Sequence, residues 1–431
     1  MRFLSKIRLY ALVACLALAA SGAVVPAAAA RQAAPPRSPW HATEVYPVVH
    51  SLTNQAVGVT PAFHGLSCLS PGNCQAAGWY ARTRRNPFGE DRPMVATESN
   101  GAWGVSQRLW LPATRADPDA GAQVTSLSCP TADWCAAGGL VPSLNSTARY
   151  AFVITKSGGR WNRPHRVQLP PDPQASPAIS EIDGISCARP GWCVAVGWYI
   201  TRAVNYTPIA VTESGGHWQR AVALPPGLRS PNFANLSSVS CPTPRWCLAV
   251  GGDTYGPHPN PPSTDLVTVF SDGRWQQPAP TQRGFPGSLV SVSCSAPGQC
   301  MAVGGGSGEL LSHGRWQGLN IPLPPDGEPI DSYGPDITSV SCTPSACLAG
   351  GRYFSETRGI FPAFVVSYSA GKWRDPVEVR LPRNASPGGS SAPPQSQSLT
   401  AVSCVRSSCE AVGTYETRTG LFPDWAAAGP G

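Results

Sequence analysis

The sequence predicts an all-β fold in which one ring of seven similar four-stranded sheets occupies most of the chain. Three observations lead to this prediction: a repeated pair of cysteines, a repeated Gly-Trp turn between successive pairs, and an incomplete repeat at each end. The 431 residues include 44 Gly and 47 Pro with no three-residue period, which is typical of many tight turns and excludes a collagen. With 42% apolar and 13% charged residues, the chain can bury a large core.

The first repeated element is a pair of cysteines with four or five turn-forming residues between them. Each copy has an apolar residue and Ser before the first cysteine and a Cys-x-Ala-x-Gly type of segment at the second. The copies lie at 66–78, 127–139, 185–197, 239–251, 292–304, 340–351 and 402–413. Such self-similarity at an interval of about 50–60 residues predicts a repeat architecture.

The second repeated element lies between the cysteine pairs and combines a β-rich run, a Gly turn and Trp. Its copies are 96–103, 154–161, 211–218, 269–275, 310–316 and 366–373. Each unit therefore offers four short strands: the apolar-Ser-Cys segment, the Cys-x-Ala-x-Gly segment, the run before the Gly turn, and a strand that starts at Trp. Four strands per repeat, with no sustained helical period, are typical of the blades of a β-propeller.

The two ends of the chain predict how the ring closes. A lone Trp40 segment precedes the first cysteine pair, and the last pair is followed only by a third-strand segment at 420–428. The Trp40 strand can therefore supply the missing outer strand of the last blade, which removes two exposed sheet edges. We expect a single seven-bladed β-propeller over residues 40–431. The alternative is a string of independent disulfide-stapled modules, which the split unit disfavours.

Residues 1–30 have the features of a secretory signal peptide. Arg2, Lys6 and Arg8 form a charged start, an apolar stretch follows, and Ala28 to Ala30 offer a small-residue cleavage site. Residues 31–39 resemble a short disordered spacer. The alternatives are a permanent membrane anchor and lipidation at Cys15. We expect a secreted, monomeric protein with no membrane span in its mature part.

Apart from Cys15, the cysteines form seven pairs that we expect to be structural disulfides. An exported protein reaches an oxidising compartment, where disulfides persist. The two cysteines of each pair lie at opposite ends of a tight hairpin, which could bring their Cα atoms to the 4.4–6.8 Å separation of a disulfide. Zinc binding and redox chemistry are the alternatives, and neither requires seven copies far apart in a ring. The expected bridges are Cys68–Cys74, Cys129–Cys135, Cys187–Cys193, Cys241–Cys247, Cys294–Cys300, Cys342–Cys347 and Cys404–Cys409.

The loops of a four-stranded blade divide between two faces. The disulfide hairpins and Gly-Trp turns share a face of short, uniform turns, whereas the loops between strands two and three and between blades are long and variable. Binding residues concentrate on such long loops. Aromatic and Arg residues there suit sugar stacking or an anionic ligand, although the aromatics could instead cap the space between blades. The candidates are Trp79, Tyr80, Arg82, Arg84, Arg85, Trp198, Tyr199, Arg202, Tyr255, Tyr353, Arg358, Tyr415 and Arg418.

The sequence carries no recognisable catalytic, metal-binding or nucleic-acid-binding motif. The net charge of +7 becomes about +4 once the three basic residues of the leader are removed, and no basic run stands out. The seven His are scattered, and neither HExxH nor GxSxG occurs. We therefore expect no cofactor, no metal and no nucleic-acid partner. Acidic residues that could still converge across blades are Glu90, Asp91, Asp183 and Glu309.

The paired-cysteine motif with its Ser-x-Gly-x-Trp turn resembles the secreted repeat proteins of actinobacteria that are regarded as β-propellers. The resemblance covers residues 40–428. The Gly-Trp turn is also similar to the Asp-box of sialidases, although only Asp272 supplies an acid beside the Gly. The Asp-box is a folding feature, and the sialidase arginine triad and Tyr/Glu pair cannot be assigned to positions here.

These observations favour a non-catalytic extracellular protein that binds a protein or polysaccharide through the long-loop face. The alternative is a glycan-cleaving enzyme on the same frame, either a sialidase-like glycosidase or a polysaccharide lyase.

Overall fold

The computed structural model describes residues 38–45, 60–81, 91–109, 121–142, 148–172, 179–224, 233–254, 263–281, 287–328, 335–386, 397–419 and 422–431. Throughout these ranges the regular structure is β-strand, and no helix occurs. The predicted signal peptide, nearly all of the spacer, and Cys15 lie outside the described residues, as do Arg82, Arg84, Arg85, Glu90 and Tyr255.

Each cysteine repeat begins with a first strand that carries the Ser-Cys pair and is followed by a second strand. The first strands are β2 (Thr60–Ser70), β7 (Gln123–Thr131), β12 (Ser180–Arg189), β17 (Phe233–Thr243), β21 (Ser291–Ala296), β26 (Asp336–Cys342) and β32 (Ser398–Val405). The second strands are β3 (Asn73–Ala81), β8 (Trp134–Pro142), β13 (Trp192–Ile200), β18 (Trp246–Thr254), β22 (Gln299–Gly304), β27 (Ala346–Arg352) and β33 (Ser408–Thr414). Within each repeat these two strands pair antiparallel.

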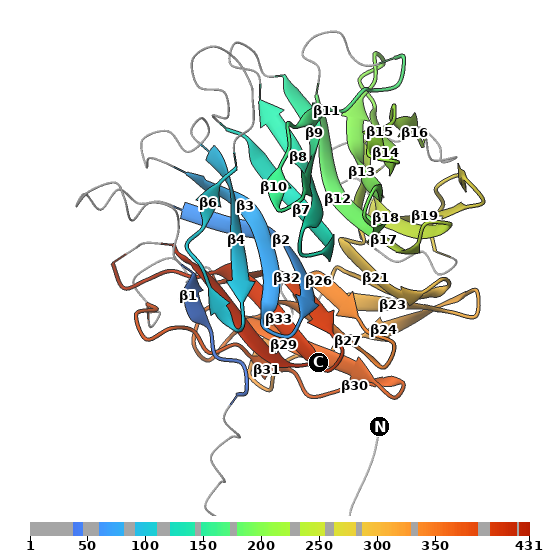
Figure 1. Cartoon of the computed structure of the whole chain (residues 1–431). Helices are drawn as coiled ribbons and strands as arrows, with labels where there is room; N and C mark the ends of the chain where they lie inside the picture. Colours follow the sequence, from blue (N-terminus) through green and yellow to red (C-terminus); the bar gives the residue numbers. More distant parts are fainter. Residues whose placement is uncertain are drawn as a thin grey trace, which may run out of the picture. The chain divides into compact units, whose positions relative to one another are not determined.

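A third strand pairs antiparallel with each second strand, and shorter outer strands follow. The third strands are β4 (Asp91–Ser99), β9 (Arg149–Ser157), β14 (Tyr206–Ser214), β19 (Ser263–Ser271), β23 (Ser307–Ser312), β29 (Ala363–Ser369) and β34 (Asp424–Pro430). The outer strands are β5 (Ala102–Trp103), β6 (Gln107–Arg108), β10 (Arg160–Trp161), β11 (His165–Arg166), β15 (His217–Trp218), β16 (Val222–Ala223), β20 (Arg274–Trp275), β24 (Arg315–Asn320), β30 (Lys372–Trp373) and β31 (Val377–Glu378). The repeated three-strand order is the predicted one (Figure 1).

The structure differs from the prediction in the outer strands and at one sheet boundary. A continuous fourth strand occurs at β24, whereas four other repeats have two two-residue pieces. The sheets of the third and fourth repeats are also joined, through one parallel pairing of Tyr206 with Phe233. A small additional sheet pairs β25 (Gly327–Glu328) with β28 (Phe354–Ser355). These features arise in the variable segments, where the repeat pattern carries no pairing information.

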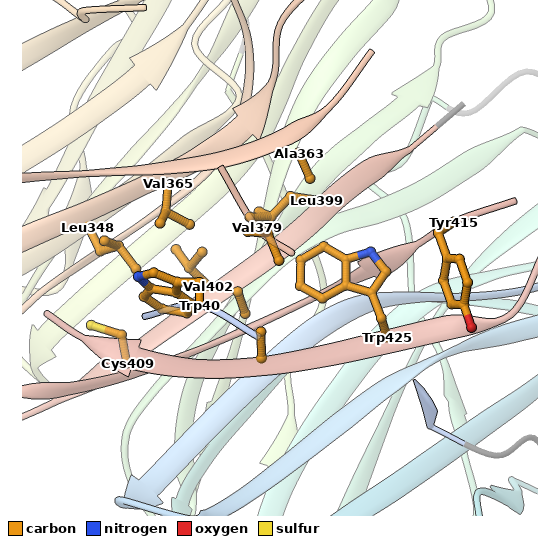
Figure 2. Close-up of a cluster of buried hydrophobic side chains, with 12 residues drawn as sticks. Trp40, Leu348, Ala363, Val365, Val379, Leu399, Val402, Cys409, Tyr415 and Trp425 are labelled. Carbon is orange, nitrogen blue, oxygen red and sulfur yellow. The ribbon is translucent and has the colours of Figure 1, made fainter. Parts of the chain in front are cut away.

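The N-terminal segment supplies the outer strand of the last sheet. Strand β1 (Thr43–Val45) pairs antiparallel with β34, so that the sheet runs β1-β34-β33-β32. The strand begins three residues after Trp40, whose side chain is 2% exposed and packs in a cluster with Trp425 and Tyr415. Figure 2 shows these aromatic rings among the aliphatic side chains of the same cluster. The first described residues of the chain are thus part of the core around its last strands.

All seven predicted disulfides are present. Their Cα–Cα distances are 4.0 to 4.1 Å, shorter than the expected range. The reason is the register: in repeats such as the third, Cys187 lies directly opposite Cys193 on the neighbouring antiparallel strand, where Cα atoms approach most closely. Each bridge therefore fastens a first strand to its second strand beside the turn.

The serine before each first cysteine accepts a hydrogen bond from the cysteine N–H of the next repeat. The bonded pairs, at 2.9 to 3.0 Å, are Ser67–Cys129, Ser128–Cys187, Ser186–Cys241, Ser240–Cys294, Ser293–Cys342, Ser341–Cys404 and Ser403–Cys68. The seventh bond joins the last repeat to the first, and Figure 1 shows β2 beside β32. A first strand lies at the edge of its sheet, so these N–H groups lack a strand partner and the serine hydroxyl satisfies them.

Replacing one of these serines should destabilise the protein. In Ser186→Ala, the N–H of Cys241, a residue only 5% exposed, loses its acceptor, and we expect a loss of about 1–2 kcal/mol in the free energy of unfolding. Urea denaturation followed by tryptophan fluorescence measures it. The matched control is Ser214→Ala, at an exposed serine of β14. An equal, small effect of both substitutions would contradict a structural role for the hydrogen bond.

Candidate functional site

The predicted binding residues lie where the second strands end and the long loops begin. Among those described, the structure separates them into buried tyrosines, arginines, and two half-buried tryptophans. Only the last group provides aromatic surface near solvent.

The tyrosines that follow the Cys-x-Ala-x-Gly segment are buried. Tyr199, Tyr353 and Tyr415 are 0 to 1% exposed, and Tyr80 is 7% exposed. Burial at this level prevents direct contact with a ligand, so the interpretation of these tyrosines as surface binding residues is corrected to that of caps between repeats. The binding role predicted for the other candidates stays a prediction.

Each of the three fully buried tyrosines donates its hydroxyl hydrogen bond to a polar side chain near the end of the preceding repeat. The acceptors are Asp172 at 2.7 Å for Tyr199, Asp326 at 3.1 Å for Tyr353, and Asn384 at 2.8 Å for Tyr415. All three acceptors stand at the fourth position of a Leu-Pro-x-Asp/Asn segment, at 169–172, 323–326 and 381–384. This recurring segment is the sequence signal that could have identified the partners. Burial and the neighbouring Asp172 raise the pKa of Tyr199.

Arg358 is an exposed residue whose guanidinium is held by acidic neighbours. Its guanidinium donates to both carboxylate oxygens of Glu378, at 2.8 and 2.9 Å, and lies 3.2 Å from Asp326. Tyr353 also donates to Glu378, at 3.2 Å. Burial, together with Glu378, raises the pKa of Tyr353, which is the opposite of what a tyrosine nucleophile requires. Tyr353, Glu378 and Arg358 thus form one hydrogen-bonded network.

The other two candidate arginines that the structure describes, Arg202 and Arg418, are also exposed. The backbone N–H of Arg202 donates to the carbonyl of Asp172, and the guanidinium of Arg418 lies 3.4 Å from the carbonyl oxygen of Ala385. Both side chains are free to meet solvent, and they come from different repeats.

Trp198, Tyr206 and Phe233 form an aromatic cluster that is partly exposed to solvent. The ring centroids of Trp198 and Tyr206 are 4.9 Å apart, those of Tyr206 and Phe233 are 4.3 Å apart, and those of Trp198 and Phe233 are 6.1 Å apart. Trp198 and Tyr206 are half-buried, and Phe233 is 37% exposed. The cluster lies where β13 ends and where β14 and β17 begin, at the pairing that joins two sheets. We refer to these three residues as the aromatic platform.

The equivalent tryptophan of the first repeat, Trp79, lies beside a histidine. The rings of Trp79 and His64 are nearly parallel, 15° apart, with centroids separated by 6.1 Å. Trp79 is half-buried and His64 is exposed. The two tryptophans predicted from the sequence thus each contact a second ring, and the sequence had not identified Tyr206, Phe233 or His64 as their partners.

Several carboxylates are buried without an ion-pair partner in the described part of the chain. Glu98 of β4 and Glu410 of β33 are 4% and 5% exposed, and the indole N–H of Trp103 lies 3.4 Å from Glu410. Burial, with the nearby Glu98, raises the pKa of Glu410 to about 8. Burial also raises the pKa of Glu213 to about 7 and that of Asp253 to about 6. Because these carboxylates are so deeply buried, they have little contact with solvent or substrate.

Of the four acidic residues predicted as convergence candidates, Glu90 lies outside the described residues, and the other three have different neighbours. Asp183 is packed beside Asn235 and Glu181, and burial raises its pKa, whereas Asp91 accepts a hydrogen bond from Gln123 at 2.7 Å and Glu309 belongs to β23. In the ranges that the structure covers, no group of three or more His, Cys, Asp or Glu side chains is arranged to hold a metal ion. No helix there is long and apolar enough to cross a bilayer.

No protein-family model matches the chain, and a search of curated proteins finds no match either. Similar solved structures include one named YCF48 bound to D1 peptide, at 12% identity and a TM-score of 0.44, covering 90% of this chain and 96% of that one. The Trypanosoma rangeli sialidase has 10% identity and a TM-score of 0.42, covering 77% and 56%. The GH74 xyloglucanase from Xanthomonas campestris has 14% identity and a TM-score of 0.46, covering 89% and 55%. The chain thus spans about half the length of these two enzymes. Structural similarity at such low sequence identity and TM-score does not indicate the function of this chain.

Removing the Glu410 carboxyl should make the protein less sensitive to alkaline pH. The pKa of Glu410 is higher in the folded state than its usual 4.5, so the folded state binds the proton more tightly and stability falls as pH rises from about 4.5 to about 8. Glu410→Gln removes this loss, and we expect its Tm at pH 8 to exceed that of the wild type by a few degrees, with a smaller gain at pH 5.

Thermal melts between pH 4.5 and pH 8.5 measure the difference. Glu356→Gln, at an exposed residue after β28, is the control and should follow the wild-type profile. A constant offset between wild type and Glu410→Gln at every pH would contradict the assignment of the pH dependence to this carboxyl.

Proposed function

We propose that this protein is a secreted, seven-bladed β-propeller that binds an extracellular or envelope polysaccharide through the aromatic platform, without cleaving it. The observation that carries the proposal is the platform itself, because half-exposed aromatic rings provide the flat apolar surface on which sugar rings stack.

The closed ring is supported by the series of Ser–Cys hydrogen bonds. Each bond joins one repeat to the next, and the bond from Cys68 to Ser403 joins the ends of the series. The pairing of β1 with β34 supports closure independently, since an outer strand from the N-terminal segment completes the last sheet. Residues Ser38–Gly431 also form one compact unit, which favours one domain over a string of separate modules.

Secretion is supported by the disulfides together with the predicted signal peptide. Seven disulfides are characteristic of an oxidising compartment. The charged, apolar and small-residue segments of residues 1–30 supply an export signal.

The position of the platform supports binding at the long-loop face. Trp198 and Tyr206 flank the loop between β13 and β14, and Phe233 starts β17 after the loop from the third repeat. Trp79 with His64 offers a second aromatic pair at the corresponding place in the first repeat. We propose these two groups as contacts for a long ligand, with Arg202 and Arg418 as exposed cations of the same loop class.

A sedimentation assay tests the proposal. The whole chain is expressed, and the exported protein is incubated with insoluble envelope polysaccharide. The polysaccharide is then pelleted, and the supernatant is scanned by mass spectrometry for released sugar. We expect protein in the pellet with no released sugar, and at least about tenfold weaker binding for Trp198→Ala, the loss expected when about 1.4 kcal/mol of stacking is removed.

The matched control is Trp316→Ala, at a half-buried tryptophan of β24 outside the platform, with the Tm of both variants measured. Released sugar would contradict a non-catalytic role and favour the glycan-cleaving alternative. Wild-type binding by Trp198→Ala would remove the platform from the proposal. Binding that survives digestion of the polysaccharide but not of envelope protein would instead identify a protein ligand.

A further inference from the structure

A basic groove lies between the outer strands of the second repeat and those of the third, and none of the aromatic platform residues lines it. Its volume is about 620 Å³, and its lining includes Arg166, Gln168, Pro170, Pro171 and Arg220. A narrower hollow of about 50 Å³ shares Arg166 and Gln168 and extends to Trp218. The binding residues predicted from the sequence include none of these side chains.

Main-chain pairing fixes which side chains face the groove. Val167 is buried and its N–H donates to the carbonyl of Ala151, so Arg166 and Gln168 on either side of it point outward. The N–H of Ala221 donates to the carbonyl of Gln168 at 2.9 Å, which ties the two repeats together at this point. Arg220, the residue before Ala221, is thereby placed beside the same segment.

Both guanidinium groups are held in place by uncharged partners. The Arg166 guanidinium carbon lies 3.5 Å from the centre of the Tyr150 ring, a cation–π geometry. Arg220 donates to the carbonyl oxygen of Leu169 at 2.6 Å. Each group therefore loses little conformational freedom when it binds a ligand, and most of its hydrogen-bond donors stay available.

The two guanidinium groups have no ion-pair partner among the described residues, although the exposed Asp172 follows the lining residue Pro171. Arg160, Arg163 and His165 add exposed basic groups along the same edge. Asp172 is the acidic residue next along the chain, and it accepts the hydrogen bond from Tyr199. An arginine pair of this kind suits the oxyanion of a carboxylate or phosphate group.

Two further features indicate a ligand that is partly apolar. Pro171, which is exposed, gives the groove an apolar surface against which the C–H face of a sugar ring can pack, whereas Pro170 beside it is buried. The indole N–H of Trp218, which lines the narrower hollow, is buried and has no hydrogen-bond acceptor among the described residues. A buried donor without an acceptor is uncommon in folded proteins, and a ligand oxygen in this hollow would satisfy it.

We propose that this groove binds an acidic polysaccharide, with Arg166 and Arg220 contacting its oxyanions and Pro171 contacting its sugar rings. The site is separate from the aromatic platform and requires no covalent chemistry. Because the contacts are charged and exposed, binding weakens as the salt concentration rises.

Three dextrans of equal length test the proposal: neutral dextran, carboxymethyl dextran and dextran phosphate. Titration of the exported protein at low salt should show binding to one or both charged dextrans and none to neutral dextran at the same sugar concentration. The comparison of the two charged forms identifies which oxyanion the groove prefers. Binding of all three dextrans with equal affinity, or of none, would overturn the proposal.

The double variant Arg166→Gln/Arg220→Gln should bind the charged dextran at least tenfold more weakly than the wild type. The control is Arg274→Gln/Arg315→Gln, which removes the same charge from two exposed arginines at Gly-Arg-Trp turns of other repeats and should stay within about twofold of the wild type. Equal losses in both double variants would show attraction to net charge alone and would overturn the assignment to the groove. Trp198→Ala should keep wild-type affinity for the charged dextran, which separates this site from the platform.

Discussion

The hydrogen bond from the cysteine N–H of one repeat to the serine hydroxyl of its neighbour is the contact on which the arrangement of the repeats depends. A first strand at the edge of its sheet exposes N–H groups that must find acceptors. Serine at this position is short enough to reach the neighbouring backbone and carries an oxygen that accepts. The same bond recurs seven times, and its donor–acceptor distance varies by no more than 0.1 Å among the repeats. Its geometry fixes each repeat relative to the next. The adjacent disulfide then fastens this strand to the rest of its own sheet.

The turns at one end of each sheet are short and uniform, whereas the loops at the other end vary in length and sequence. The seven hairpins have similar lengths, as do the six Gly-Trp turns, so changes in sequence accumulate in the loops that follow the second strands. There, equivalent positions carry different side chains: Tyr199 and Tyr353 cap the space between repeats, whereas Asp253 occupies the same position in the fourth repeat. The aromatic platform arises from such local departures from the repeat, whereas the basic groove lies among the outer strands of the second and third repeats.

The sequence predicted the features that repeat and missed those that depend on neighbouring repeats. Cysteine spacing was enough to identify the disulfides, because both partners of each bridge lie in one hairpin. For Tyr199 the sequence leaves open both a binding role and a capping role, because its acceptor Asp172 lies in the preceding repeat. Phe233 was not identified because it starts a strand of the fourth repeat, and only the folded arrangement brings it to Trp198. The pairing of Arg166 with Tyr150 likewise depends on strand register, which spacing alone does not give.

The most direct test of this account is amide hydrogen exchange at the first cysteine of each repeat. If the repeats form a closed ring, the N–H of Cys68, bonded to Ser403 of the last repeat, should be as strongly protected as the N–H of Cys187 or Cys294, bonded to serines of the repeats just before them. Rapid exchange at Cys68, with slow exchange at the other six cysteines, would show that the ends do not meet and would contradict closure.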